Sequence, residues 1–523
     1  MNLILKLRIP VEKDSPAQYI EAASIALGLG AENIAVVKLL EKALNITDQK
    51  QFYYDIVLVA SVPAGFANTE NLPIHVENVK SVSQTKYSGD RPLIVGFGPA
   101  GMFAALEFIE HGIQPLVFER GRKIEERSLD VQRFIEKRTL DTESNIQFGE
   151  GGAGSFSDGK LFSRMNNAGY VKKVLDTFIK FGAPQEIAFA AKPHLGTDVL
   201  CGVVRNIRNY IIEHGGEIFY SAKMTDLLIS DGKAVGLVIN GQKEYRASHI
   251  YLAVGHSARD TFELLEKKGI TLEQKPISIG VRIEHPVEII NLMRYGEKYK
   301  DFQHIGAAVY SVNYADRILG RAVHTFCMCP GGEVVNASSS NGLLAINGMS
   351  YSKRNSAFSN SAIVATCRAQ DYGSASPLAG IEFQKSIEQK AFAAGGGNWK
   401  VPAQNLTDFL RGECSSSLIE NSCKTGTAAA NLRMIFPEFI CNLLTDAFAK
   451  WKKEEFPLFV SEHALLMGPE TRTSCPVRIT RGDNFESVNM KNLYPIGEGA
   501  GYAGGITSSA ADAIKSVESI LLS

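Results

Sequence analysis

Three glycines, Gly96, Gly98 and Gly101, stand between a run that predicts a strand (PLIVGFG) and a run that predicts a helix (AGMFAALEFIEHG). In this order the first glycine permits a tight turn, the second lets a pyrophosphate approach the backbone, and the third lets helix and strand pack closely. The helix N-terminus offers free N–H groups to phosphate oxygens. The spacing therefore predicts a dinucleotide-binding turn, with Pro99 and Ala100 opening the helix.

An acidic residue follows this turn at the distance expected of a ribose-binding acid. The next apolar run, QPLVFERG, ends in Glu119 and Arg120, about 20 residues after the glycines. A carboxylate there binds ribose hydroxyls and favours the unphosphorylated ribose of FAD or NAD over that of NADP. Strand, glycines, helix, strand and acid in this order are far more specific than a lone GxGxxG.

A second strand, glycine-rich turn and helix occur near the end of the sequence, in NLYPIGEGAGYAGGITSSAADAIKSVESIL, residues 492–521. This segment resembles the closing motif of the glutathione-reductase-type flavoproteins. In that family an acidic residue after the glycine binds the ribityl chain, and the following helix N-terminus faces the flavin. The resemblance implies cofactor contacts from Gly497, Glu498, Gly505 and Ile506.

The segment IYLAVGHSARDT, residues 250–261, resembles the strand-and-glycine crossing motif of the same family. Ala253, Val254 and Gly255 stand where Ala-Thr-Gly is usual, which removes one side-chain contact and leaves the backbone turn possible. Three segments in the family's order imply FAD, with Gly255 among its contacts. No His or Cys lies in an obvious flavin-linking context, so we expect FAD to be bound non-covalently.

The segment FGEGGAGSFSDGKLFSR, residues 148–164, narrows the resemblance. Together with PHLGTD, VRIEHP, FCMCPGGEVVNASS, ETRTSCPVR and GEGAGYAGGI, it is similar to a group of bacterial FAD-dependent proteins, predicted NAD-utilising dehydrogenases whose substrate is not defined. The resemblance covers nearly the whole chain after residue 85. It implies a FAD domain built from three separated segments, with a large domain inserted before the last, and it implies no particular reaction.

The glycine-rich part of this segment can present successive backbone N–H groups to phosphate or flavin oxygens. Lys160 could supply the positive charge near the flavin N1 and O2 edge that stabilises anionic reduced flavin. An ordinary solvated lysine and a structural Ω-loop are the alternatives. The cofactor contacts expected here are Gly152, Ala153, Ser155, Asp158, Gly159 and Lys160.

Two histidines and one arginine are candidates for catalysis. His194 (KPHLGTD) and His285 (VRIEHP) lie beside prolines in expected loops, and removing hydride from a C–OH or C–NH centre needs a base such as His. Arg282 lies among apolar residues of a predicted strand and could clamp a substrate carboxylate. The alternatives are hydrogen-bonded structural histidines and a plain ion pair.

The eight cysteines show no CxxC pair and no density typical of a disulfide scaffold. On an extended strand Cys327 and Cys329 would point to one face, and a disulfide across a single residue would be strained. We expect buried, reduced cysteines, with thiol–disulfide chemistry or one reactive thiol near flavin as alternatives. Cys414 and Cys423 lie too far from any histidine cluster to suggest zinc, and no metal site is predicted.

The pattern of elements divides the chain into domains that must position these residues. Residues 1–85 predict a small α+β module of strand, helix, strand and strand, followed by a polar linker at 81–92. We expect FAD-binding segments at 90–269 and 466–523 around an inserted, mixed α+β substrate domain at 270–465. The expected fold class is α/β, with a doubly wound, Rossmann-type FAD domain of glutathione-reductase type.

Composition excludes some classes of protein. Lys plus Arg number 55 and Asp plus Glu 56, a net charge of -1 that argues against a surface for coating nucleic acid. The apolar stretches are short or interrupted by charge, and Lys6 and Arg8 occupy what would be the apolar region of a signal peptide. We expect a soluble, cytoplasmic protein that acts on a small molecule.

The expected function is that of a FAD-dependent oxidoreductase, which transfers hydride between a small organic substrate or NAD(P)H and FAD. The glycines of AAGGGNWKVP, residues 393–402, follow a helical stretch and predict a loop, so NAD(P)H would dock only transiently. Two alternatives are a flavoenzyme acting on RNA or protein that residues 1–85 recruit, and a non-enzymatic flavin-binding sensor.

Overall fold

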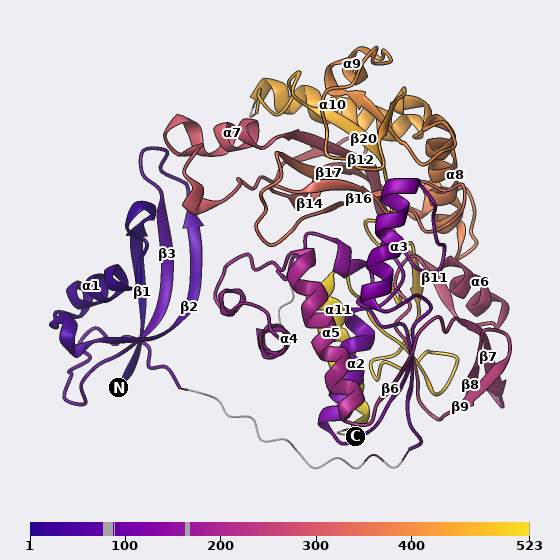
Figure 1. Ribbon diagram of the computed structural model, residues 1–523, viewed down its shortest axis with the longest axis horizontal. Helices are drawn as coiled ribbons and strands as arrows, with labels where there is room; N and C mark the ends of the chain where they lie inside the picture. Colours follow the sequence, from indigo (N-terminus) through magenta and orange to yellow (C-terminus); the bar gives the residue numbers. More distant parts are fainter. Residues whose placement is uncertain (77–86, 88, 163–167, 455, 522–523) are drawn as a thin grey trace.

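The computed structural model describes residues 1–76, 87, 89–162, 168–454 and 456–521. The linker expected at 81–92 lies mostly outside these residues, and so does Arg164 at the end of the glycine-rich segment. Figure 1 shows an N-terminal module beside a central domain, with an inserted domain above the central one.

The N-terminal module is one helix on a three-stranded antiparallel sheet of order β1-β3-β2. Ser15 caps the helix by accepting a hydrogen bond from the N–H of Gln18, and Gly28 ends it in the left-handed conformation. Leu5 and Tyr19 pack between helix and sheet. The elements are β1 (Asn2–Pro10), α1 (Pro16–Leu27), β2 (Ala35–Asn45) and β3 (Tyr53–Ser61).

This module contacts both other parts of the molecule. Lys42 of the edge strand β2 exchanges backbone hydrogen bonds with Phe189 and Ala191 of the central domain. Phe52 stacks on Tyr299 of the insert, with ring centroids 4.2 Å apart. Part of the β2 edge is therefore already paired and is not available to a partner strand.

A five-stranded parallel sheet, of order β22-β10-β4-β5-β6, forms the centre of the second domain and confirms the expected α/β class. Its short strands are mostly apolar because helices or another sheet cover both faces. The strands are β4 (Leu93–Val95), β5 (Leu116–Phe118), β6 (Glu217–Phe219), β10 (Ile250–Leu252) and β22 (Leu493–Pro495).

Helices cover one face of this sheet, and an antiparallel sheet covers much of the other. The helices are α2 (Pro99–Glu110), α4 (Ala168–Lys180), α5 (Thr197–Glu213) and α11 (Ile506–Leu521). The opposite face packs on β7 (Met224–Ser230), β8 (Lys233–Ile239), β9 (Lys243–Arg246) and α6 (Arg259–Lys267). Helix α3 (Ile124–Lys137) follows β5 and leads into the glycine-rich segment.

The insert contains a seven-stranded mixed sheet of order β13-β14-β17-β12-β20-β18-β19. Its strands are β12 (Ile277–Pro286), β13 (Asn313–Asp316), β14 (Arg321–Cys329), β17 (Phe358–Cys367), β18 (Val401–Asn405), β19 (Thr427–Ala429) and β20 (Leu465–Glu470). A smaller sheet pairs β15 (Glu333–Asn336) with β16 (Ile346–Met349). The helices are α7 (Val287–Tyr299), α8 (Ala379–Ala394), α9 (Leu406–Arg411) and α10 (Glu438–Glu454).

The insert extends beyond the boundary expected at residue 465, because strand β20 is part of its sheet. This strand pairs with β12 and β18 in the middle of the insert's sheet. The chain then returns to the central domain through β21 (Val477–Ile479), which pairs with β11 (Leu272–Gln274), the strand by which it left. The two crossings between the domains therefore lie side by side.

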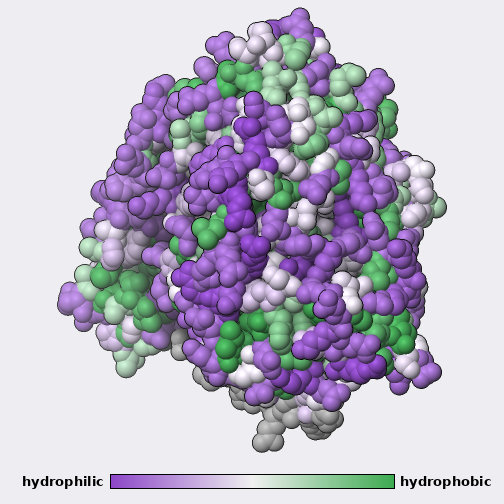
Figure 2. Space-filling view, turned by 45° about the vertical axis from the view of Figure 1, so that its right-hand side comes forward, coloured by the Kyte–Doolittle hydropathy of each residue, from purple (hydrophilic) through white to green (hydrophobic). Residues whose placement is uncertain are grey.

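The surface drawn in Figure 2 is mainly hydrophilic, and hydrophobic residues form small, scattered groups on it. Within the described ranges, no helix combines the length and the apolar character that crossing a membrane requires.

Candidate functional site

A cavity of about 1010 Å³ lies between the carboxyl edge of the parallel sheet and the insert. Parallel strands end at the same edge, so the turns after β4, β5, β10 and β22 meet there. The insert closes the other side. The lining residues belong to the segments 95–100, 118–120, 147–162, 222–224, 253–261 and 496–509 of the central domain, and to 324–327, 347–348 and 470–474; not every residue of these segments faces the cavity.

The three glycines after β4 are required for different reasons. Gly96 has a φ of +98°, and a Cβ there would lie 2.4 Å from the carbonyl oxygen of Ala253. A Cβ on Gly101 would lie 1.9 Å from the oxygen of Gly96. Gly98 differs, because the nearest atom to its Cβ position is 3.5 Å away, an ordinary contact. Gly96 and Gly101 thus serve the protein's own packing, whereas the absence of a side chain at Gly98 keeps the cavity open.

Glu119, the expected ribose-binding acid, joins the glycine turn to the glycine-rich segment. Its carboxylate accepts hydrogen bonds from the backbone N–H groups of Phe97 (2.8 Å), Gly121 (2.9 Å) and Gly149 (3.0 Å). It also lines the cavity. A carboxylate has about four acceptor positions, so Glu119 can still accept a hydrogen bond from a ligand.

Two residues that sequence reasoning missed hold the glycine-rich segment in place. Arg127 of α3 is fully buried and donates hydrogen bonds to the carbonyls of residues 145, 146, 149 and 150. The carboxylate of Glu150 accepts from the N–H of Ile124, the hydroxyl of Tyr220 and the guanidinium of Arg208. The charge-rich pattern IEERSLDVQRF is typical of a solvated helix face and gives no sign that Arg127 points inward.

Most of the expected cofactor contacts line the cavity, while Gly101, Ser155 and Gly497 lie behind its wall. Gly497 is packed against Ala100, and Ser155 lies beneath Gly151. Those that line it are Gly96, Gly98, Pro99, Ala100, Glu119, Arg120, Gly152, Ala153, Asp158, Gly159, Lys160, Gly255, Glu498, Gly505 and Ile506.

Lys160 lies where the glycine-rich segment meets the insert. Its ammonium group donates to the carboxylate of Asp158 and to the carbonyl of Met328. Asp158 also accepts from the guanidinium of Arg354 (2.6 and 3.2 Å) and from the hydroxyl of Ser350. Burial alone would raise the pKa of Asp158, but the attraction of Lys160 and Arg354 outweighs it and holds that pKa below its ordinary value. The carboxylate therefore stays ionised beside two cations.

Neither of the two candidate histidines lines the cavity. His194 pairs with Lys160 through the backbone but does not line the cavity, and burial, with Arg354, lowers its pKa to about 4. His285 lies inside β12 and not in a loop, because Pro286 ends a strand there. Its ring stacks on Phe459 and donates from Nε2 to the Phe459 carbonyl at 2.8 Å. His285 is thus a hydrogen-bonded core histidine.

Arg282 forms the ion pair that the sequence left as an alternative to a substrate clamp. The Arg282 side chain is completely buried. Its Nε and Nη2 atoms donate hydrogen bonds to the carboxylate of Glu470, at 2.9 and 3.1 Å. It also donates to the carbonyl of Cys327 and the side chains of Asn347 and Asn360. Arg282 therefore lies behind the cavity wall, where it positions residues that do line the cavity.

The two neighbouring cysteines do not share one exposed face. The strand is irregular between Phe326 and Cys329, and Cys327 has a φ of +40°. Cys327 lines the cavity, whereas Cys329 is buried. Burial raises the pKa of the Cys327 thiol to about 12, so it is protonated at neutral pH. The described residues contain neither a disulfide nor a cluster of three metal-ligating side chains.

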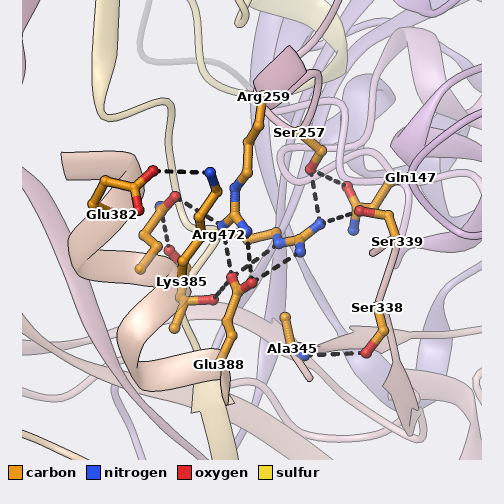
Figure 3. A network of polar contacts seen from close by, with 12 residues as sticks. Gln147, Ser257, Arg259, Ser338, Ser339, Ala345, Glu382, Lys385, Glu388 and Arg472 are labelled. Atoms are coloured by element: carbon orange, nitrogen blue, oxygen red, sulfur yellow. Dashed lines mark hydrogen bonds and ion pairs between the residues drawn. The ribbon is translucent and has the colours of Figure 1, made fainter. Parts of the chain in front are cut away.

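Sequence reasoning also missed a polar network on the side of the cavity formed by 253–258 and 470–474 (Figure 3). Arg259 and Arg472 both reach the carboxylate of Glu388 in α8. The motif ETRTS contains Arg472, but its partners lie 84 and 215 residues away, at Glu388 and Ser257. Only the fold brings them together.

Glu284, beside His285 in β12, predicts a pH dependence of stability. Its carboxyl is 1% exposed and accepts from the backbone N–H of Ser422 (2.8 Å) and its hydroxyl (2.5 Å). Burial raises the pKa of Glu284 to about 7 from an ordinary 4.5. The folded protein therefore holds a proton that the unfolded chain releases, so this residue's contribution to stability falls as pH rises from about 4.5 to 7.

Glu284→Gln is expected to remove that dependence, because the amide keeps the shape and can bond both Ser422 groups without a charge. At pH 8 the variant should be more stable than wild type by an amount on the order of 2 kcal/mol, and near pH 4 the two should be equal. Urea unfolding across this pH range measures it. If the difference in free energy of unfolding between variant and wild type were the same at every pH, Glu284 would not be the source of the pH dependence.

Comparisons with known proteins extend these observations. Residues 276–473 match the family described as FAD-dependent protein, C-terminal domain-like. A Clostridium beijerinckii protein, described only as uncharacterized, is 44% identical over 448 residues, which cover 85% of this chain and 83% of that protein.

The similarity to solved structures is low in both sequence identity and TM-score. The quinol fumarate reductase of E. coli is 11% identical with a TM-score of 0.36, over 82% of this chain and 68% of that chain. The 3-ketosteroid-delta4-(5alpha)-dehydrogenase of Rhodococcus jostii RHA1 is 11% identical with a TM-score of 0.33, over 84% and 98%. Because 44% identity extends over most of both chains, the protein belongs to the same family as the Clostridium protein, and its residues 276–473 match the model of FAD-dependent proteins.

Proposed function

We propose that this protein is an oxidoreductase that transfers hydride between a small organic substrate, or NAD(P)H, and non-covalently bound FAD. The observation that carries the proposal is a single cavity that joins the glycine turn after β4 to side chains of the insert. When bound, FAD supplies hydride transfer, and the protein supplies binding, orientation and charge. A cavity of ligand size and a net charge of -1 favour a small-molecule substrate over nucleic acid.

The residues of the cavity fit FAD at its nucleotide end. The volume is at the upper end of the range for ligand pockets, as a dinucleotide requires. Gly98 and Gly152 line the cavity without side chains, and their backbones lie close together, since a Cβ on Gly152 would lie 2.9 Å from the Cα of Gly98. The N-terminus of α2, at Pro99 and Ala100, would bind the pyrophosphate, and Glu119 the adenosine ribose.

At the other end, Glu498 and the N-terminus of α11 would hold the ribityl chain and the flavin. Burial raises the pKa of Glu498 to about 7, so near neutral pH its carboxyl can donate to or accept from a hydroxyl. Gly505 and Ile506 open α11, which offers N–H groups to flavin oxygens. Lys160 would place its positive charge near the flavin N1 and O2 edge, as part of the same proposal.

The test is an anaerobic titration of the purified full-length protein. Its absorbance band near roughly 450 nm should report FAD, and NADH and NADPH are then added separately. Bleaching much faster than that of free FAD by one nucleotide would identify a nicotinamide-fed reductase. Bleaching only by an organic donor would identify a substrate-fed dehydrogenase. Bound flavin that no donor reduces would favour the sensor alternative, and a protein that cannot bind FAD would refute the proposal.

A further inference from the structure

We infer that Arg472 and the turn 255–257 form an oxyanion-binding subsite of the cavity, which takes a phosphate or a carboxylate group. This Arg472 subsite rests on the proposed use of the cavity as a flavin and substrate site. The subsite specifies the chemical class of a bound group, which the proposed function leaves open. Three independent observations support the subsite.

The first observation is an excess of buried positive charge (Figure 3). The fully buried carboxylate of Glu388 accepts two hydrogen bonds from Arg259, both 2.8 Å, and two from Arg472, at 3.1 and 3.2 Å. Across the described part of the chain, neither guanidinium pairs with a second carboxylate. Two positive charges thus share one negative charge where little water can reach them, and a bound anion would restore the balance.

The second observation is that Arg472 has a donor to spare. Its Nη1 donates to the hydroxyls of Ser257 (3.2 Å) and Ser339 (2.6 Å), while Nε and Nη2 reach Glu388. A guanidinium has five N–H groups, so these four contacts leave one without a partner among the residues described. Arg472 and Ser257 line the cavity and Arg259 does not.

The third observation is a set of free backbone donors next to Arg472. Gly255 has a φ of +71°, and a Cβ there would meet nothing within 4 Å, so the turn faces open space. Within the described residues, the N–H groups of 255, 256 and 257 donate no hydrogen bond. Successive N–H groups at a left-handed residue form a concavity that binds anions.

His256 responds to the same positive surroundings. It lines the cavity, and its Nδ1 lies 2.9 Å from the hydroxyl of Ser257. Burial and then the charges of Arg472 and Arg259 lower its pKa to about 3, so the ring stays neutral. The neutral ring of His256 therefore adds no charge to the subsite at physiological pH.

The oxyanion has two possible sources: the pyrophosphate of the dinucleotide, or an acidic group of the substrate. Three full-length proteins distinguish them: wild type, Arg472→Gln and Arg259→Gln. Arg259→Gln is the matched control, because it removes the same charge from the same carboxylate at a position outside the cavity lining. The readouts are the dissociation constant for FAD, from flavin fluorescence, and the shift in unfolding midpoint caused by inorganic phosphate or acetate at constant ionic strength.

If the pyrophosphate is the ligand, Arg472→Gln should weaken FAD binding by about 10- to 100-fold, and Arg259→Gln by far less. Phosphate should then stabilise the wild-type apoprotein but not the FAD-loaded protein. If the substrate carries the anion, FAD affinity should stay within about threefold in both variants. In that case phosphate or acetate should stabilise the FAD-loaded wild type and Arg259→Gln, but not Arg472→Gln.

Equal behaviour of the two variants in both readouts would overturn the subsite, because any loss would then come from the disrupted network. Arg472→Lys keeps the positive charge and serves as a second variant in case Arg472→Gln does not fold. It should retain part of the stabilisation by phosphate or acetate. A phosphate response that requires Arg472 in a protein unable to bind FAD would retain the subsite while refuting the proposed function.

Discussion

Gly98→Ala is expected to weaken FAD binding by about 100-fold or more while leaving the unfolding midpoint of the apoprotein nearly unchanged. The protein has room for the added Cβ, whose nearest neighbour would be 3.5 Å away, but the methyl group would occupy the cradle of the pyrophosphate. Displacing that group would break at least two hydrogen bonds to charged oxygens, worth about 1.5–3 kcal/mol each. Fluorescence titration of apoprotein with FAD gives the affinity.

Gly202→Ala serves as the control, because a Cβ at this helical glycine has room as well, with nothing within 4 Å, and the residue lies outside the cavity lining. It should bind FAD as wild type does. Gly101→Ala should instead lose the fold, since its Cβ would lie 1.9 Å from a backbone oxygen. Wild-type FAD affinity in Gly98→Ala would refute the proposed position of the pyrophosphate.

Arg282→Met is expected to lower the free energy of unfolding of the insert by about 3–5 kcal/mol. The substitution would leave the carboxylate of Glu470 nearly buried without its counter-charge, and the carbonyl of Cys327 and the side chain of Asn360 without a donor. Both tryptophans, Trp399 and Trp451, lie in the insert. Their fluorescence during urea unfolding therefore reports on this domain.

The double variant Arg282→Met, Glu470→Met should recover much of that loss, because it removes both charges and replaces them with apolar groups. If Arg282→Met unfolds at the wild-type urea concentration and loses only substrate affinity, the guanidinium would be a substrate clamp after all. The stability measurement thus separates the two roles that the sequence allowed.

The parts of the site that could be predicted from the sequence are those that local chain geometry dictates. Gly96 and Gly101 are required by a turn and by a helix that follow directly along the chain, so their spacing is visible in the sequence. The same holds for Glu119 and for the glycines near Glu498. Because parallel strands end at one edge, three such turns in order already predict that they meet.

The site candidates that the structure places outside the cavity lining have surroundings formed by distant strands. His285 and Arg282 lie in β12, which has a neighbouring strand on each side in the insert's sheet. The strand is also buried along most of its length and does not alternate between inside and outside, so its polar residues are enclosed and paired. Strand β20 was assigned to the wrong domain for a similar reason, since only its pairing with β12 shows where it belongs.

The sequence by itself thus determined which class of cofactor site to expect and in which order its segments occur, because both follow from motifs a few residues long. The tertiary structure alone decided which charges face the cavity. Arg472 meets Glu388 and Ser257 across 84 and 215 residues, and Arg127 turns inward onto carbonyls 18 to 23 residues away. Such contacts depend on how segments far apart in the sequence pack around the same cavity, and the local sequence pattern does not predict that packing.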